Sequence, residues 1–167
     1  MSFRYHIVET ALGWVGLVRS EQGLRHTTLP QPSPRAVSEL LGPSLVGAVE
    51  DGAAFTDLAQ RLRRYFGGEK VYFPDSLDLS GVPPFHRAIW EKVRTIPYGE
   101  TRSYAWAAGE VGRPRACRAV GQAMARNRLP LVVPCHRVVG SDGDLRGFGG
   151  GLALKRTLLD LEARSGR

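Results

Sequence analysis

Cys135 and His136 stand next to each other behind the apolar run 131–133, which predicts a strand that delivers both side chains. A thiol beside a proton acceptor can form a thiolate nucleophile. Neighbouring residues of a strand point to opposite faces, so a turn at Pro134 or a bridging water is needed to join the two groups. The alternative is a buried structural thiol. Sulfur chemistry would rest on this cysteine or on Cys117, the only other one in the chain.

A histidine that removes a proton from a thiol is usually oriented by a third group, most often a carboxylate. The candidate is Glu162, because it lies in the predicted C-terminal helix, which must pack against the segment before it. The sequence alone leaves this contact open.

The net charge of +7 is spread unevenly over the 167 residues. Residues 1–83 carry a net charge of −1 and residues 84–167 a net charge of +8, with the change at Pro83-Pro84. A basic half beside a neutral half suggests that one half faces a polyanion. A solvated basic surface without a partner is the alternative.

The composition excludes several classes of protein. No apolar run approaches the roughly 20 residues that span a bilayer, and the N-terminus lacks the apolar region of a signal peptide. The two cysteines form no Cys-x-x-Cys pair, which argues against a disulfide scaffold and a structural zinc site. We expect a cytoplasmic protein that does not bind membranes.

The pattern of apolar residues predicts an α+β protein with two domains, 1–80 and 84–167. The first is expected to be a small antiparallel sheet with a helix; its predicted elements are strands at 3–8, 14–19 and 24–29 and a helix at 55–66. Residues 35–52 show too little periodicity to be placed. The second is expected to be mainly helical, with a helix over 84–95 and an active-site loop.

Two further helices of the second domain are separated by the turn Gly112-Arg113-Pro114. The first begins after Ser103, a favourable N-cap residue, and the second has alanines at helical spacing and ends near Asn127. Two helices joined by a short turn with glycine are typical of a helix-turn-helix unit.

The second of these helices has a polar stripe opposite its alanines, formed by Arg115, Arg118, Gln122 and Arg126. Arginine and glutamine commonly contact phosphates and base edges. Gly121 costs about 1 kcal/mol relative to alanine inside a helix, which suggests that something large comes close to the backbone there. A solvated basic face is the alternative.

A tight turn at 140–144 and a glycine-rich stretch at 147–151 follow the cysteine. The stretch lacks the pattern of a phosphate-binding loop. Glycines permit close approach to a ligand, so we expect a pocket wall in which Phe148 stacks on a flat molecule. A flexible surface loop is the alternative.

Together these segments resemble the O6-alkylguanine-DNA alkyltransferases, also called methylated-DNA–protein-cysteine methyltransferases. The resemblance is dense over 84–164 and thin over 1–80. The matching segments are Pro134-Cys135-His136-Arg137-Val138, Arg118 to Met124, Ile96 to Thr101 with Ser103-Tyr104, and Gly149-Gly150-Gly151 leading to Lys155.

The resemblance implies roles for individual residues. Cys135 would accept the alkyl group, and His136, oriented by Glu162, would deprotonate it through a water. Asn127 would brace the loop before the cysteine, Tyr104 would hydrogen-bond guanine N3, and Lys155 would support the site. The DNA-binding residues would be Arg118, which fills the gap left by a flipped nucleotide, with Arg115, Gln122, Arg126, Ala119 and Gly121. The substrate pocket would be formed by Pro130, Val138, Phe148 and Gly149, with the main-chain carbonyls of Cys135 and Val138 reading the exocyclic amine.

The implied function is direct reversal of DNA damage. A helix-turn-helix in the minor groove would flip an O6-alkylguanine out of double-stranded DNA, and the alkyl group would pass irreversibly to Cys135. O4-alkylthymine is a further candidate substrate. The resemblance implies that the protein needs no cofactor and no metal and that it is a monomer. Whether it assembles cooperatively on DNA is left open.

Three positions depart from the common family pattern. Phe148 stands where many members have tyrosine, Gly149 where serine is frequent, and Arg128 where proline is common. The absence of a serine hydroxyl suggests that larger alkyl groups fit the pocket. Cys117 matches no catalytic position, and a structural role is expected for it.

Two other functions stay open. A DNA-binding protein without chemistry, such as a regulator or an alkyltransferase-like lesion sensor, would need no acceptor cysteine. A cysteine hydrolase using Cys135, His136 and Glu162 would turn over repeatedly and would not need the basic stripe.

Overall fold

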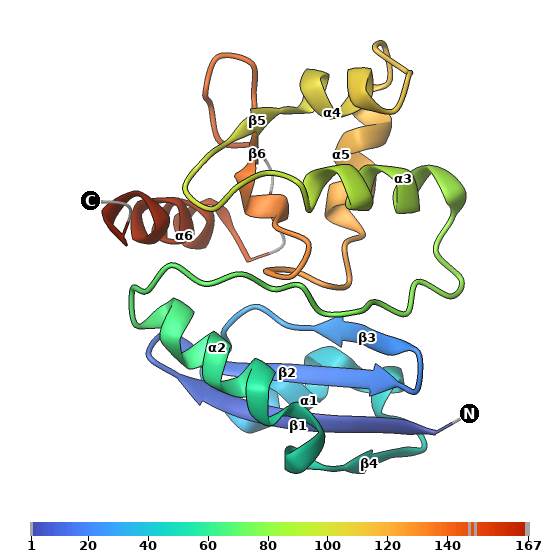
Figure 1. The fold of residues 1–167 in the computed structure, drawn as a ribbon, viewed down its shortest axis with the longest axis vertical. Helices are drawn as coiled ribbons and strands as arrows, with labels where there is room; N and C mark the ends of the chain where they lie inside the picture. Colours follow the sequence, from blue (N-terminus) through green and yellow to red (C-terminus); the bar gives the residue numbers. More distant parts are fainter. Residues whose placement is uncertain (1, 147, 149, 166–167) are drawn as a thin grey trace. The chain divides into compact units, whose positions relative to one another are not determined.

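The computed structural model describes residues 2–146, 148 and 150–165 and confirms the predicted α+β class (Figure 1). The chain divides into two compact units, Met1–Leu79 and Ser80–Arg167. Within the described residues, no helix is both long and apolar enough to cross a membrane.

The first unit is built on a four-stranded sheet with the order β3-β2-β1-β4. Its strands are β1 (Phe3–Thr10), β2 (Gly13–Ser20), β3 (Gly23–Thr27) and β4 (Ala48–Glu50). The first three form the antiparallel meander expected from the sequence, and β4 adds a parallel edge to β1. The segment 35–52, which the sequence left unplaced, contributes this edge strand.

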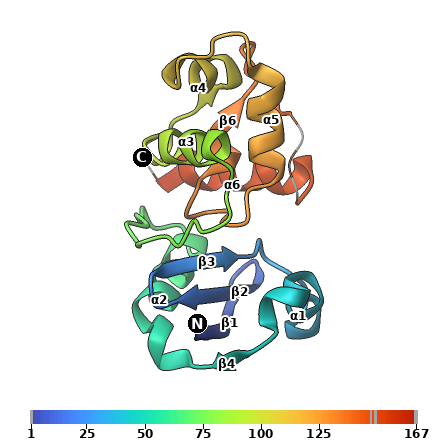
Figure 2. The ribbon, with the colours of Figure 1, turned by 90° about the vertical axis from the view of Figure 1, so that its right-hand side faces the viewer.

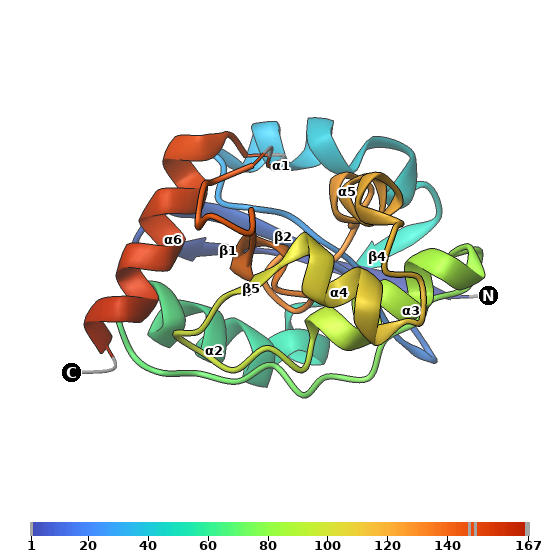
Figure 3. The same ribbon diagram turned by 90° about the horizontal axis from the view of Figure 1, so that it is seen from above.

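Helices cover both faces of this sheet (Figures 2 and 3). The helical segments are α1 (Pro34–Leu41), the 3-10 turns η1 (Gly42–Leu45) and η2 (Gly52–Phe55), and α2 (Thr56–Phe66). Helix α1 lies close to the sheet because Gly16 has no side chain. A Cβ atom at Gly16 would lie 2.4 Å from Cγ1 of Val37 and 2.8 Å from Cδ1 of Leu41.

The second unit is mainly helical and has one short parallel ladder, β5–β6. Its elements are α3 (Pro84–Val93), β5 (Arg102–Ser103), α4 (Tyr104–Glu110), α5 (Cys117–Ala125), the 3-10 turn η3 (Cys135–Arg137), β6 (Val138–Val139) and α6 (Leu152–Ser165). Helices α3, α4 and α5 lie to one side of the ladder and α6 to the other (Figures 1 and 3).

The predicted helix-turn-helix corresponds to α4 and α5. Ser103 caps α4 by accepting a hydrogen bond from the backbone N–H of Trp106 at 2.9 Å. Helix α3 braces the pair, because the indole N–H of Trp90 donates to the carbonyl of Ala123 in α5 at 2.9 Å. Helix α5 is thus held in place by a buried aromatic residue of α3.

Two predictions about local structure were wrong. Helix α5 is shorter than the stripe suggested, since Arg115 precedes the helix and Arg126 is its C-cap residue. The run 131–133 is a turn rather than a strand, closed by a bridge between Pro130 and Val133. Prolines at 130 and 134 have no N–H for a ladder, and Leu131 adopts a φ of 77° that a strand does not allow.

Candidate active site

Cys135 opens the 3-10 turn η3, and its thiol faces a pocket of ≈ 710 Å³. The residue itself is only 7% exposed. The turn places Cys135 and His136 in non-extended backbone, so the geometry of a strand, with side chains on opposite faces, does not apply here. Further lining residues come from α4, from α5 and from the segment after β6, namely Tyr104, Ala105, Cys117, Arg118, Gly121, Met124, Ala125, Gly140, Ser141, Arg146 and Phe148.

Asn127 fastens the loop that joins α5 to the cysteine. Its amide N–H donates to the carbonyl of Val133 at 3.0 Å, and its side-chain oxygen accepts from the N–H of Leu129 at 3.0 Å. Hydrogen bonding by the Asn127 side chain also lowers the pKa of the Cys135 thiol, which favours the thiolate. A single amide therefore fixes both ends of the turn 129–133.

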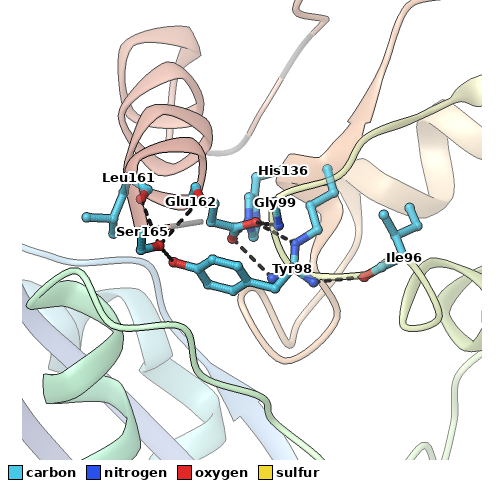
Figure 4. A network of polar contacts seen from close by, with 8 residues as sticks. Ile96, Tyr98, Gly99, His136, Leu161, Glu162 and Ser165 are labelled. Carbon is cyan, nitrogen blue, oxygen red and sulfur yellow. Dashed lines mark hydrogen bonds and ion pairs between the residues drawn. The ribbon is translucent and has the colours of Figure 1, made fainter. Parts of the chain in front are cut away.

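His136 and Glu162 form a buried pair, each with 1% of its surface exposed (Figure 4). Nε2 of His136 lies 2.5 Å from Oε2 of Glu162. Because a carboxylate only accepts, Nε2 carries the hydrogen in this contact and Nδ1 carries the lone pair of the neutral ring. The predicted contact between η3 and α6 is therefore present, and it defines the tautomer of the histidine.

Arg137 and Gly99 supply the remaining contacts of Glu162. Nε of Arg137 donates to Oε1 at 2.8 Å, Nη2 donates to Oε2 at 3.1 Å, and the N–H of Gly99 donates to Oε1 at 3.1 Å. Nη1 of Arg137 also donates to the carbonyl of Ile96 at 2.9 Å, and the hydroxyls of Tyr98 and Ser165 hydrogen-bond each other nearby (Figure 4). The carboxylate is thus satisfied by one full positive charge and two further donors.

These contacts decide the charges of the pair. Burial alone would raise the pKa of Glu162, but hydrogen bonds and charge from His136 and Arg137 outweigh it and hold that pKa far below its usual range. Burial lowers the pKa of His136 despite the hydrogen bond to Glu162, and the charge of Arg137 lowers it further. The pair at neutral pH is therefore an ionised carboxylate with a neutral imidazole.

The thiol of Cys135 is protonated at rest. Burial raises its pKa, against the opposing effects of the hydrogen bond from Asn127 and the charge of Lys155. Lys155 is fully buried, and its Nζ donates to the carbonyls of Val138 at 2.7 Å and Arg146 at 3.2 Å. A neutral thiol beside a neutral imidazole needs an acceptor for its proton at the moment of reaction.

Two aromatic rings flank the same ammonium group. Nζ of Lys155 lies 5.9 Å from the ring centre of Tyr104 and 6.0 Å from that of Phe148. Burial raises the pKa of Tyr104, and a charge on Cys135 raises it further. Phe148 lines the pocket, as expected from the glycine-rich stretch. The pocket therefore combines a flat aromatic wall, a phenol and the thiol.

The residues predicted to bind DNA lie on or beside α5. Arg115, Arg118, Gln122 and Arg126 are exposed, and Ala119 and Gly121 are partly buried. Only Arg118 and Gln122 of the polar stripe belong to the helix itself. A Cβ atom at Gly121 would meet nothing within 4 Å, so the space beside this glycine is open. Small side chains and open space leave room for a bulky partner against the helix.

Four other residues that the sequence analysis singled out are not placed as it expected or lie outside the described residues. Pro130 and Val138 are buried and do not belong to the pocket lining; the carbonyl of Val138 accepts from Lys155. Gly149 lies outside the described residues. Cys117 is exposed and lines the pocket, because it lies at the start of α5. The structural role expected for it stays a prediction.

Sequence reasoning gave no role to Arg137, Gly99 or Arg146. Arg137 directly follows the Cys-His pair, and a buried arginine beside a proposed carboxylate relay could have been suspected from that position alone. Gly99 acts through its backbone N–H, which no side-chain pattern reveals. Arg146 precedes the glycine-rich stretch and lines the pocket.

The comparisons agree with this geometry. Residues 84–164 match the family described as 6-O-methylguanine DNA methyltransferase, DNA binding domain. A methylated-DNA–protein-cysteine methyltransferase of Mycolicibacterium paratuberculosis is 42% identical over 160 residues, which cover 96% of this chain and 92% of that relative. The structure of the Mycobacterium tuberculosis O6-methylguanine methyltransferase has a TM-score of 0.82 at 37% identity, covering 98% of this chain and 94% of the other.

A second solved structure, Mycobacterium tuberculosis OGT in complex with DNA, has a TM-score of 0.81 at 37% identity and covers 97% of this chain and 94% of the other. The identity extends over nearly the full length of both chains, including the N-terminal unit where the sequence resemblance was thin. From this agreement in sequence, fold and site we conclude that the chain belongs to the methylated-DNA–protein-cysteine methyltransferase family.

Proposed function

We propose that this protein repairs DNA by transferring the alkyl group of O6-alkylguanine to Sγ of Cys135, and that each molecule acts once. The observation that carries the proposal is the placement of the thiol. Cys135 lies at a pocket with an aromatic wall, and the next residue is a buried neutral histidine oriented by an ionised glutamate. This is the equipment for an acceptor thiol that loses its proton only during the reaction.

The alkylated oxygen lies at a base edge inside the stacked duplex, so the base must leave the stack to reach a buried thiol. Extrusion costs a few kcal/mol, and less for a damaged pair. We infer that α5 enters the minor groove, where its small residues and the open space beside Gly121 permit close approach. Arg118, exposed at the pocket, would occupy the gap in the stack. A relative of known structure was solved in complex with DNA.

The transfer itself is a displacement at the alkyl carbon. The proton of Cys135 passes to Nδ1 of His136 through a water, and Sγ forms a bond to the carbon as the carbon–O6 bond breaks. The electron pair of that bond goes to O6, and the guanine takes up a proton. The net change exchanges the alkyl group on the base for the proton on the sulfur. Glu162, already ionised, stabilises the imidazolium that forms.

Tyr104 is the proposed proton donor to guanine N3. The negative charge on Cys135 raises the pKa of this phenol, so consumption of the thiolate makes Tyr104 a better acid at the moment when the leaving base needs a proton. Lys155 stabilises the thiolate by its charge and contacts the ring of Tyr104. Asn127 stabilises the thiolate by a hydrogen bond.

The product thioether is stable, and the proposed chemistry includes no group that would remove the alkyl group from sulfur. We therefore propose a single turnover with no cofactor, and O4-alkylthymine as a second substrate. We assign DNA binding and alkyl transfer to the second unit and a scaffold role to the first. The protein is proposed to act as a monomer on double-stranded DNA, with cooperative binding still to be tested.

The test counts guanines restored by a known amount of protein. Duplex DNA containing O6-methylguanine is supplied in tenfold excess, and the restored guanine is measured to a plateau. We expect one equivalent per protein and none for Cys135→Ser. Continued product formation beyond one equivalent would indicate a hydrolase, and tight lesion binding without product would indicate a lesion sensor. The variant Cys117→Ser is the matched control and should retain one equivalent.

A further inference from the structure

The pocket contains a positive charge that the proposed transfer does not use. Two of its lining residues are charged, Arg118 and Arg146, and both are arginines. Arg118 has a proposed role in the DNA stack. Arg146 lies in the segment after β6, on the wall that also carries Gly140, Ser141 and Phe148. Among the described residues of this wall, Arg146 is the one with a charged side chain that lines the pocket.

Local contacts hold Arg146 in this wall. Its carbonyl accepts from Nζ of Lys155 at 3.2 Å, so its backbone is tied to a fully buried residue. Its side chain covers Gly140, where a Cβ atom would lie 2.8 Å from Nε and 3.1 Å from Nη2. The guanidinium can occupy this position beside the pocket because Gly140 has no side chain.

The charge of Arg146 is weakly compensated. Nη2 of Arg146 lies 3.9 Å from Oδ1 of Asp142, and both side chains are more than half exposed, at 57% and 62%. Asp142 also accepts a hydrogen bond from the backbone N–H of Asp144 at 3.0 Å. A long and exposed ion pair of this kind contributes little, roughly 0–1 kcal/mol. The guanidinium can therefore exchange this contact for a better anion.

The reacting atoms lie in the same pocket. Arg146 acts electrostatically on Tyr104, whose pKa its charge lowers, and both residues line the pocket with Cys135. The alkyl carbon must approach Sγ of Cys135 for transfer. A substituent on that carbon would therefore enter the pocket that Arg146 also lines. A carboxylate there would find a guanidinium, the donor geometry that suits it best.

We propose that Arg146 determines specificity by favouring O6-alkylguanines whose alkyl group carries a carboxylate, such as carboxymethyl, over O6-methylguanine. The proposal rests on the proposed function, because it assigns a substrate class to the same site. A phosphate of the DNA backbone offers similar chemistry to an arginine, but a backbone phosphate is present beside every lesion. A phosphate contact would therefore accelerate repair of both lesions equally.

The experiment measures single-turnover rate constants of alkyl transfer on two duplexes that differ only in the O6 substituent, methyl or carboxymethyl. The quantity of interest is the ratio of the carboxymethyl rate to the methyl rate. We expect Arg146→Gln to lower this ratio about three- to tenfold, the size expected of a charge-assisted contact that stays partly exposed. Arg146→Lys, which keeps the charge, should retain most of the ratio.

Arg156→Gln is the matched control, because it removes the same charge from an exposed residue of α6 that is not among the lining residues of this pocket. Its ratio should equal that of the unaltered protein. An unchanged ratio in Arg146→Gln, or an equal loss of rate on both duplexes, would overturn the proposal. Failure of the proposed function is distinguishable, since the unaltered protein would then transfer neither group to Cys135.

Discussion

Arg137 donates a hydrogen bond to each carboxylate oxygen of Glu162, from Nε to Oε1 at 2.8 Å and from Nη2 to Oε2 at 3.1 Å. This contact explains how a buried glutamate beside His136 can be ionised while the imidazole stays neutral. The arginine compensates the charge of the carboxylate, and the carboxylate is left to orient the ring. The acceptor for the thiol proton is therefore kept in its basic form by the residue next to it.

Replacing Arg137 should disturb both stability and the charge of the histidine. We expect Arg137→Met to lower the free energy of unfolding by about 3–5 kcal/mol, because a buried carboxylate loses its ion-pair partner. The pKa of His136 should rise, since the charge of Arg137 lowers it. Urea unfolding measures the first effect, and the pH profile of alkyl transfer, shifted to higher pH, measures the second.

Arg35→Met is the control for this prediction, because Arg35 and Glu39 form an ion pair with side chains 88% and 68% exposed. Its effect on unfolding should stay below about 0.5 kcal/mol. Arg137→Lys keeps a charge and serves if the methionine variant does not fold. A pH profile that matches the unaltered protein in both Arg137 variants would contradict the account.

His136 should make the stability of the protein depend on pH below about 6.5. Its pKa in the folded state lies below its ordinary value of about 6.5, so the unfolded chain binds the proton first as the pH falls. The contribution is fully present above pH 6.5 and is lost as the pH drops through the folded pKa. For one proton the slope is at most about 1.4 kcal/mol per pH unit.

The measurement compares urea unfolding of the protein and of His136→Gln at several pH values. The difference between the two free energies should shrink as the pH falls from 7 to 5. The folded pKa of Glu162 is also lowered, so its contribution to the free energy of unfolding should be lost at a lower pH, below about 4.5. A difference that grows on acidification would mean that His136 is protonated in the folded state.

The two cysteines should differ strongly in reactivity toward small alkylating reagents. Cys117 is exposed, whereas Cys135 is buried and its pKa is raised. We expect iodoacetamide to label Cys117 at least roughly tenfold faster in the native protein, because Cys135 is buried and its raised pKa reduces its thiolate fraction. Peptide mapping over time measures the two rates. In urea the two rates should converge, and equal rates in the native state would contradict the burial of Cys135.

Gly121 allows stability and DNA repair to be separated. Gly121→Leu should leave folding intact or stabilise it by up to about 1 kcal/mol, because leucine favours helices and a Cβ atom there meets nothing within 4 Å. Alkyl transfer should fall by roughly tenfold or more, since a displacement of about 1 Å between DNA and thiol has effects of this order. Thermal unfolding and single-turnover rates provide the two readouts.

Gly109→Leu is the matched variant, because Gly109 lies in α4, is exposed and also has open space around its Cβ position. It should gain helix stability without a comparable loss of rate. Equal rates in both variants would show that α5 does not approach DNA closely at Gly121.

The sequence predicts the helices and the buried pair better than it predicts the loops between them. Periodic apolar residues indicated α4 and α5, and the need for a carboxylate indicated Glu162. The turn at 131–133 was missed because three apolar residues are equally consistent with a strand, and only the left-handed backbone of Leu131 and the flanking prolines decide it. Helix α1 was missed because its packing depends on Gly16, which is distant in sequence.

The roles of Arg137, Gly99 and Arg146 depend on tertiary contacts. A backbone N–H such as that of Gly99 leaves no trace in residue type, and Arg137 reaches Glu162 across 25 positions of the chain. Cys117, for which a structural role was expected, is exposed and lines the pocket, a position that its residue type alone does not reveal.

The central claim is that Cys135 receives the alkyl group. The most direct test is the intact mass of the protein after incubation with duplex DNA containing O6-methylguanine, followed by peptide mapping. We expect a stoichiometric gain of one methyl group, located on Cys135, with guanine restored in the DNA. An unchanged mass despite tight binding to the lesion, or a methyl group on Cys117 instead, would contradict it.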